Sequence, residues 1–175
     1  LTAANAFTRT GAIFFTSCNF NFQNGVTGNG NVISQDREVN QTFETIKATE
    51  GIDVFVAQGA KTSIKVEADE NVIDLIETKV NNGKLLIECR EQIGRVSAKK
   101  VYVTLPNISN LETTSGANLN SMGTLNANNI TLEASSGSDL IVELQADEVT
   151  TNASSGADIE LYGVTNILIA RASSG

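Results

Sequence analysis

The chain has 175 residues, of which 41% are hydrophobic but only 5% aromatic. Its core must therefore use Ile, Val, Leu and Ala, which favours stacked β-structure over a globular core with large anchors. The formal net charge is −8, and residues 101–175 carry eight acids against one base, Arg171. This acidic half argues against binding to nucleic acid or anionic lipid. The chain lacks His, the usual general base and nucleophile partner, so we expect no enzyme.

The first 27 residues indicate a leader segment. Cys18 follows the sequence AIFFTS, which approximates the end of a lipoprotein signal, and we predict it as a possible lipidation site. Two other interpretations stay open, namely a different non-cytoplasmic N-terminus and an ordinary structured segment. A lead-in rich in Asn and Gly follows. Its Gly28-Asn29-Gly30 motif lacks the flanking strand and helix of a nucleotide-binding loop, so we assign it no phosphate.

Residues 28–106 form the predicted N-terminal β region. Apolar residues alternate with polar ones along this segment, as at Ile52, Val54 and Val56, and this period of two predicts strands. Several shorter features accompany the strands. They are a hairpin at Asn81-Asn82-Gly83, one or two helical turns within Asn71 to Glu77, and Cys89 as a small buried strand residue.

Residues 107–175 repeat a Ser-Gly pair, with glycines at 116, 137, 156 and 175 that are 21, 19 and 19 residues apart. Gly116, Gly137, Gly156 and Gly175 supply the sharp corners. Aligned on them, apolar residues fall into columns, as a β-solenoid requires, because each rung packs on its equivalents. The columns are Leu119, Leu140 and Ile159; Ala134, Ala153 and Ala172; and Ile130, Val149 and either Ile167 or Leu168. We predict an all-β fold of one continuous domain, in which antiparallel or solenoid-like strands of the N-terminal region lead into rungs of 19 to 21 residues, each with two or three short strands.

The chain also resembles a known family. The sequence GNGNV from Gly28, the stretch REVNQTFETIKATEGIDVFVAQG and the ASSG and SGAD repeats resemble the GIN-domain family, the autotransporter-like adhesin head domains of bacterial envelopes. The eponymous triplet is here Gly51-Ile52-Asp53, with Asp in place of Asn. The resemblance implies a right-handed parallel β-helix, a secreted or lipid-anchored location, and adhesion or binding. It implies no catalytic residues.

A polar column directly after the corners is the most chemical feature of the repeats: Asn118, Asp139 and Asp158. Rungs stack about 4.8 Å apart, so the carboxylates could approach one another. A glycosidase pair is one interpretation, but this region offers only Tyr162 as an aromatic platform. A bridging Ca²⁺ is the second. The third, which we favour, is that these side chains hydrogen-bond the corner backbone and face water.

A second column precedes each corner, and it consists of Glu112, Glu133, Asn152 and Arg171. We expect an exposed polar ladder, either a solvated face or a recognition surface for a basic partner. Taken together, these features predict a non-catalytic module outside the cytoplasm that binds a glycan or another envelope component. A carbohydrate-active β-helix enzyme and a purely structural envelope protein are the alternatives. No cofactor is required, although Ca²⁺ remains an option, and the oligomeric state stays open.

Overall fold

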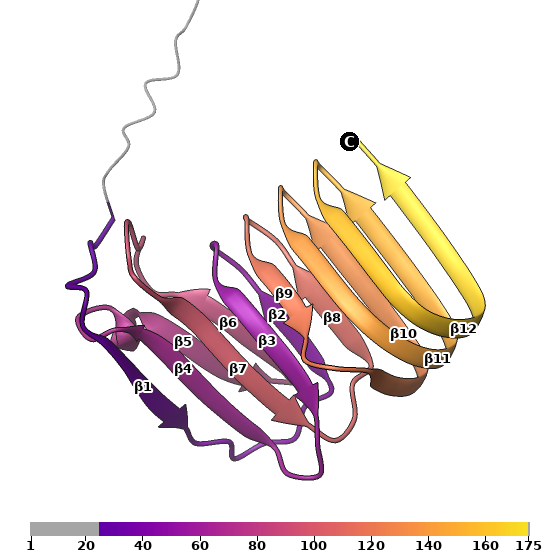
Figure 1. Cartoon of the computed structure of the whole chain (residues 1–175), viewed down its shortest axis with the longest axis horizontal. Coiled ribbons are helices and arrows are strands. Elements are labelled where there is room, and N and C mark those ends of the chain that lie inside the picture. The colour runs from indigo at the N-terminus through magenta and orange to yellow at the C-terminus, as the bar shows by residue number, and fades with distance from the viewer. Residues whose placement is uncertain (1–24, 175) are drawn as a thin grey trace, which may run out of the picture.

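The structure is a computed structural model that describes residues 25–174, and it is all-β as the sequence predicts (Figure 1). One short 3₁₀ helix, η1 (Ile73–Leu75), interrupts the strands. The strands are β1 (Val32–Arg37), β2 (Thr45–Ala48), β3 (Asp53–Gln58), β4 (Ser63–Asp69), β5 (Ile76–Asn81), β6 (Lys84–Cys89), β7 (Lys99–Leu105), β8 (Asn110–Thr113), β9 (Asn118–Ser121), β10 (Leu125–Ser135), β11 (Asp139–Ser154) and β12 (Asp158–Ser173). No helix in this part of the chain has the length and apolar character needed to cross a membrane.

The strands form one mixed sheet that folds over into two layers (Figure 1). The front layer runs in the order β1, β4, β7, β3, β9 and β11, and the back layer runs β5, β6, β2, β8, β10 and β11. Strand β11 belongs to both layers, since Asp139–Ile141 pair with β9 while Leu144–Ser154 pair with β10. Strand β12 lies beside β11 along almost its whole length. We call a back strand together with the front strand that follows it a coil.

The repeats stack in parallel and in the predicted register. Leu140 lies opposite Leu119 on one side and Ile159 on the other. The alanine column is confirmed in the same way, because Ala153 pairs with Ala134 and Ala172. In the third column the partner of Val149 is Leu168 rather than Ile167.

In the N-terminal region the coils stack in an order that differs from their order in the chain. The coil β2–β3 lies between coil β6–β7 and coil β8–β9. All of these neighbours are parallel, whereas β1, β4 and β5 add antiparallel pairs at the outer edge. The region is therefore part parallel coil and part antiparallel edge.

At each corner two successive residues, not glycine alone, adopt the left-handed backbone conformation with positive φ. Ser136 has φ 56° and Gly137 φ 66°, and the other Ser-Gly corners are alike. Gly175 lies outside the described residues. One further corner of this kind joins β2 to β3, where Glu50 has φ 60° and Gly51 φ 64°. The coil geometry therefore begins well before the first Ser-Gly repeat.

The shorter sequence predictions in the N-terminal region hold with small changes. Asn82 and Gly83 both have positive φ and join β5 to β6, as the hairpin prediction requires. The helical segment is limited to the single turn η1, because Ile76 already begins β5. Cys89 lies in β6 and is half-buried, packed against the core.

The core fills the space between the two layers with stacked aliphatic side chains. Val54, Leu119 and Leu140 are fully buried on neighbouring front strands. Opposite them, Leu111 and Leu132 are fully buried on the back strands. Because side chains alternate along each strand, every buried column leaves an outward column beside it. The outward columns of the front layer carry the candidate site.

Candidate functional site

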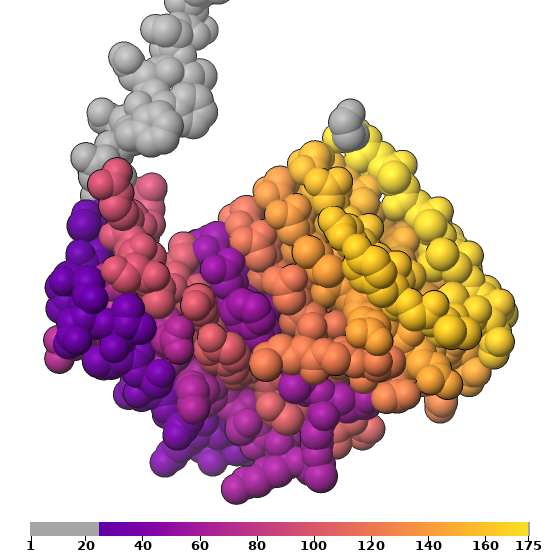
Figure 2. All heavy atoms as spheres, in the orientation of Figure 1, coloured from indigo at the N-terminus to yellow at the C-terminus, as the bar shows by residue number. Residues whose placement is uncertain are grey.

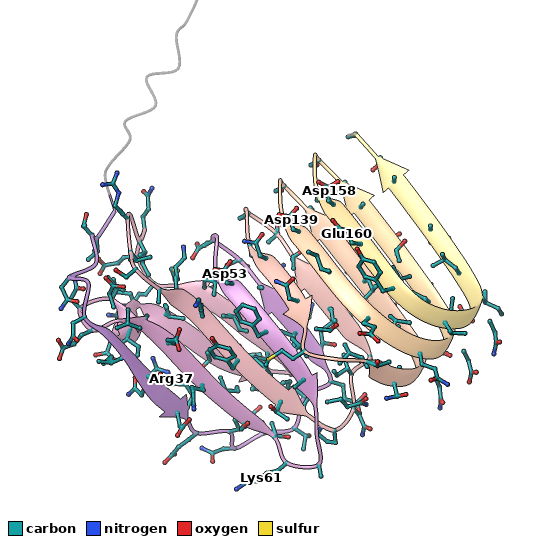
Figure 3. All side chains as sticks on the ribbon, viewed as in Figure 1. Arg37, Asp53, Lys61, Asp139, Asp158 and Glu160 are labelled. Carbon is teal, nitrogen blue, oxygen red and sulfur yellow. The ribbon has the colours of Figure 1, made fainter. Side chains whose placement is uncertain are left out.

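The predicted column of Asn118, Asp139 and Asp158 exists on the front layer, just after the corners. Figure 3 shows Asp139 and Asp158 on adjacent strands of that layer. The structure extends the column to Asp53 on β3, whose Oδ1 accepts a hydrogen bond of 2.8 Å from Nδ2 of Asn118. Asp139 and Asp158 are both exposed and follow as register neighbours. Within residues 25–174, no three His, Cys, Asp or Glu residues gather in a way that could hold a metal ion.

The same column continues beyond Asp53 with alternating charge. Lys100 is the register partner of Asp53, and its Nζ lies 3.5 Å from Oε1 of Glu67. At the N-terminal end of the column, each acid therefore has a lysine beside it. At the other end, the two acids Asp139 and Asp158 lie next to each other.

A second outward row lies beside this column and carries aromatic rings, which the sequence analysis missed. Phe55 and Tyr102 are register partners on β3 and β7, with ring centroids 5.1 Å apart and an interplanar angle of 18°. Both are half-buried. We call the row on which they lie the aromatic row, and in order across the strands it comprises Lys65, Tyr102, Phe55, Asn120, Ile141 and Glu160.

Two further exposed side chains lie next to the aromatic row. Tyr162 is 57% exposed, and its hydroxyl donates a hydrogen bond of 2.9 Å to Glu160. This hydrogen bond and the negative charge of Glu160 raise the pKa of Tyr162. Met122 is 55% exposed, and its backbone N–H bonds to the carbonyl of Val56 on β3. The front layer thus carries both exposed apolar side chains and acids, and its surface continues from the N-terminal strands to the C-terminal repeats (Figure 2).

The predicted ladder on the back layer is in register, but it is less exposed than expected. Glu112 is only 9% exposed, because Nζ of Lys84 lies 2.6 Å and Nζ of Lys47 4.0 Å from its carboxylate oxygens. Glu133 accepts a hydrogen bond of 3.4 Å from Asn152, and Arg171 is exposed. The expectation of a uniformly exposed ladder is therefore wrong at Glu112, where two lysine side chains cover the carboxylate.

Asp69 is a buried acid that sequence reasoning also missed. Its carboxylate accepts hydrogen bonds from the backbone N–H groups of Gly30, Ser97 and Ala98, at 2.8, 2.9 and 3.0 Å. Burial opposes its ionisation, but these hydrogen bonds outweigh that effect and lower the pKa of the carboxyl. A Cβ on Gly28 would clash with Oδ2 of Asp69, so glycine at this position allows the close approach. The GNG motif therefore wraps a carboxylate, which is a structural role.

Neither cysteine adds chemistry within the described residues. Burial raises the pKa of the Cys89 thiol to about 11, so it is protonated and unreactive at neutral pH. Cys18, the predicted lipidation site, lies outside the described residues.

The sequence matches the family model described as "Putative auto-transporter adhesin, head GIN domain" over residues 42–175. Among solved structures, the chain is similar to a "putative lipid binding protein" from Parabacteroides distasonis, with 16% identity, a TM-score of 0.66, and coverage of 86% of this chain and 76% of that one. A "putative adhesin" from Parabacteroides merdae has 14% identity and a TM-score of 0.64 over 85% of this chain and 80% of that one.

A third similar structure, a "putative adhesin" from Bacteroides fragilis, has 15% identity and a TM-score of 0.59 over 86% of this chain and 97% of that one. These likenesses show a shared fold. No curated protein matches the chain. Because the family model covers well over half of the sequence, this chain belongs to the GIN-domain family that the model describes.

Proposed function

We propose that this chain is a non-catalytic binding module of the bacterial cell surface and that the front layer is its binding face. The observation that carries the proposal is the exposed apolar surface on that layer, made by Met122, Ile141 and Tyr162 beside the Phe55–Tyr102 pair. Contiguous apolar side chains on an outer face, rimmed by polar groups, are typical of interaction sites. The family description and the names of two structural neighbours, each called a "putative adhesin", support the same function.

The arrangement of the acids favours binding over hydrolysis. A glycosidase places its two carboxyl groups on either side of the scissile bond. Asp139 and Asp158 instead lie side by side on adjacent strands of one sheet, and both are exposed on its outer surface. They are placed to hydrogen-bond or repel a partner, not to enclose one.

Several finer features belong to the same proposal. We place the protein in the cell envelope, with a lipid on Cys18 as its only membrane attachment, and we give the coils the right-handed winding that the GIN-domain family implies. Binding needs no cofactor. Should a cation take part, Asp139 and Asp158, with the amide of Asn118, are the residues that would hold Ca²⁺.

The proposal is tested by measuring retention and turnover together. The purified chain is passed over immobilised polysaccharides, peptidoglycan, extracellular-matrix proteins and lipid vesicles, with and without Ca²⁺, and the eluate is assayed for released fragments. We expect saturable retention on at least one surface and no released fragments. Fragment release would instead identify an enzyme, and the absence of retention on every surface would favour a purely structural role.

A further inference from the structure

We propose that the aromatic row binds a neutral glycan, with Phe55 and Tyr102 forming the contact for the apolar side of a sugar ring. This inference rests on the proposed binding function and names both the site and the class of ligand. It starts from where the aromatic residues lie.

The fold directs large rings outward on the front layer. On β3, Val54 and Val56 are fully buried and Phe55 between them points out. On β7, Val101 and Val103 are buried and Tyr102 between them points out. Of the four aromatic side chains in residues 25–174, only Phe43 belongs to the buried core, at 5% exposure. A chain with so few rings thus places three of these four on one outer face.

The neighbours of the rings match the polar groups of a sugar. A pyranose ring has apolar C–H faces and a rim of hydroxyl groups, so it needs an aromatic contact with hydrogen-bonding side chains alongside. Asn120, with its side-chain amide, is the register partner of Phe55, and Lys65, with its ammonium, is the register partner of Tyr102. Asp53 and Lys100 point to the same side of the sheet as the two rings, because they precede Phe55 and Tyr102 by two residues on their strands. Donors and acceptors therefore surround the aromatic pair.

Charge on the part of the face toward β12, which a chain of sugars would cross, opposes anionic ligands. Four acids lie on its outer surface toward β12: Asp139, Glu143, Asp158 and Glu160. In the part of the chain that the structure describes, none of these four has a Lys or Arg within salt-bridge distance. Uronic-acid, sulfated or phosphorylated polymers would meet this negative field, whereas an uncharged polymer would not.

The length of the face favours a chain of sugars over a single one. From Tyr102 on β7 to Tyr162 on β12 there are four strand steps, or about 19 Å at the usual strand spacing. Asn120 and Ile141 occupy the steps between them. An oligosaccharide lying across the strands would contact the aromatic pair at one end and Tyr162 at the other.

The experiment presents the 175-residue chain with matched neutral and anionic polysaccharides on one array. A neutral oligosaccharide from a retained polymer is then titrated by calorimetry. We expect Phe55→Ala and Tyr102→Ala each to weaken its binding about tenfold or more, and Asn120→Ala to weaken it severalfold. The matched control, Thr150→Ala on the outer surface of the back layer, should bind as the unchanged chain does. Binding confined to anionic polymers, or unaffected by the first two substitutions, would overturn the inference.

The aromatic pair also stabilises the sheet, so its replacement by Ala could abolish binding through loss of the fold. A second measurement therefore uses the unchanged chain. Amide chemical shifts of the unchanged, ¹⁵N-labelled chain are followed during titration with the same neutral oligosaccharide. Perturbations should cluster on β3, β7 and β9 and extend across β11 to Tyr162 on β12, and perturbations confined to the back layer would contradict the site. If the chain binds proteins or cells but no neutral glycan, the inference fails while the binding function stands. If it is retained on no surface at all, both fail.

Discussion

The N-terminal coils and the C-terminal repeats share one geometry but treat charge differently. In the N-terminal region acids meet cations, as where Glu67 meets Lys100, and the same holds where this region adjoins the repeats, as where Lys84 meets Glu112. In the repeats, acids follow one another across strands, as Asp139 and Asp158 do. The backbone therefore does not dictate the surface. Stacked aliphatic columns hold the coils together in both regions, and the outward positions are free to serve solubility or recognition.

The largest expected effect comes from the shared core. Leu140 is fully buried and stacks between Leu119 and Ile159. Leu140→Ala should lower the free energy of unfolding by about 2 to 5 kcal/mol, because it removes buried methyl groups and leaves a cavity. The neighbouring Ile141→Ala is the control, since that side chain points outward. Urea denaturation measures both variants, and equal losses would show that the stacked columns are not the main source of stability.

Acid should act mainly on the N-terminal region, through Asp69. Its pKa is lowered in the folded chain, so its contribution to stability is present above the ordinary carboxyl pKa and is lost as the pH falls toward the folded value. We expect Asp69→Asn to lower the melting temperature at pH 7 and to flatten the decline in melting temperature between pH 5 and pH 2. Asp139→Asn, on the exposed column, is the control. A decline in Asp69→Asn as steep as in the unchanged chain would contradict the assignment.

The corners should respond alike in both regions. Gly51 and Gly137 have φ of 64° and 66°, and neither has backbone close enough to block a methyl group. Replacing either glycine by Ala should cost about 1 to 2 kcal/mol, because an L-residue is strained at positive φ. Thermal unfolding of the two variants provides the comparison. Clearly unequal losses would mean that the β2–β3 corner is not equivalent to the Ser-Gly corners.

The smallest expected effects on stability come from removing single charges, and they should differ in sign between an acid beside lysines and an acid beside another acid. Glu112→Gln removes a charge that two lysines approach, and we expect a loss of about 1 kcal/mol. Asp139→Asn removes a charge beside another acid and should stabilise the chain by about 0.2 to 0.5 kcal/mol at low salt. Both changes should shrink in 1 M NaCl as salt screens the charges. Unfolding at two salt concentrations tests this, and effects of the same sign would erase the proposed contrast.

Much of the repeat region could be predicted because its contacts are periodic in sequence. A spacing of 21 and then 19 residues sets which side chains meet, so the columns of Leu140 and Asp139 follow from the Ser-Gly pairs alone. The polar ladder followed too, although the burial of Glu112 did not. That burial depends on Lys84 and Lys47, which arrive from outside the repeats.

The aromatic row could not be predicted, because it too depends on contacts between segments that are far apart in the sequence. Phe55 and Tyr102 are 47 residues apart and meet only because β3 and β7 are neighbours in space. The corner at Glu50 and Gly51 was hidden as well, since 65 residues separate Gly51 from Gly116. Its sequence, TEGID, does resemble TSGAN and SSGSD, and that likeness is the signal that could have revealed it.

Coil β2–β3 lies between two coils that both come later in the chain, and this order affects the folding kinetics. Its neighbours come from segments that follow it by about 40 to 65 residues, so it cannot gain its partners until β6 to β9 have been made and closed back on it. The last coils need only the strand made about 19 residues earlier. We therefore expect a slow, cooperative nucleation around β2–β3, followed by rapid addition of the repeats one at a time.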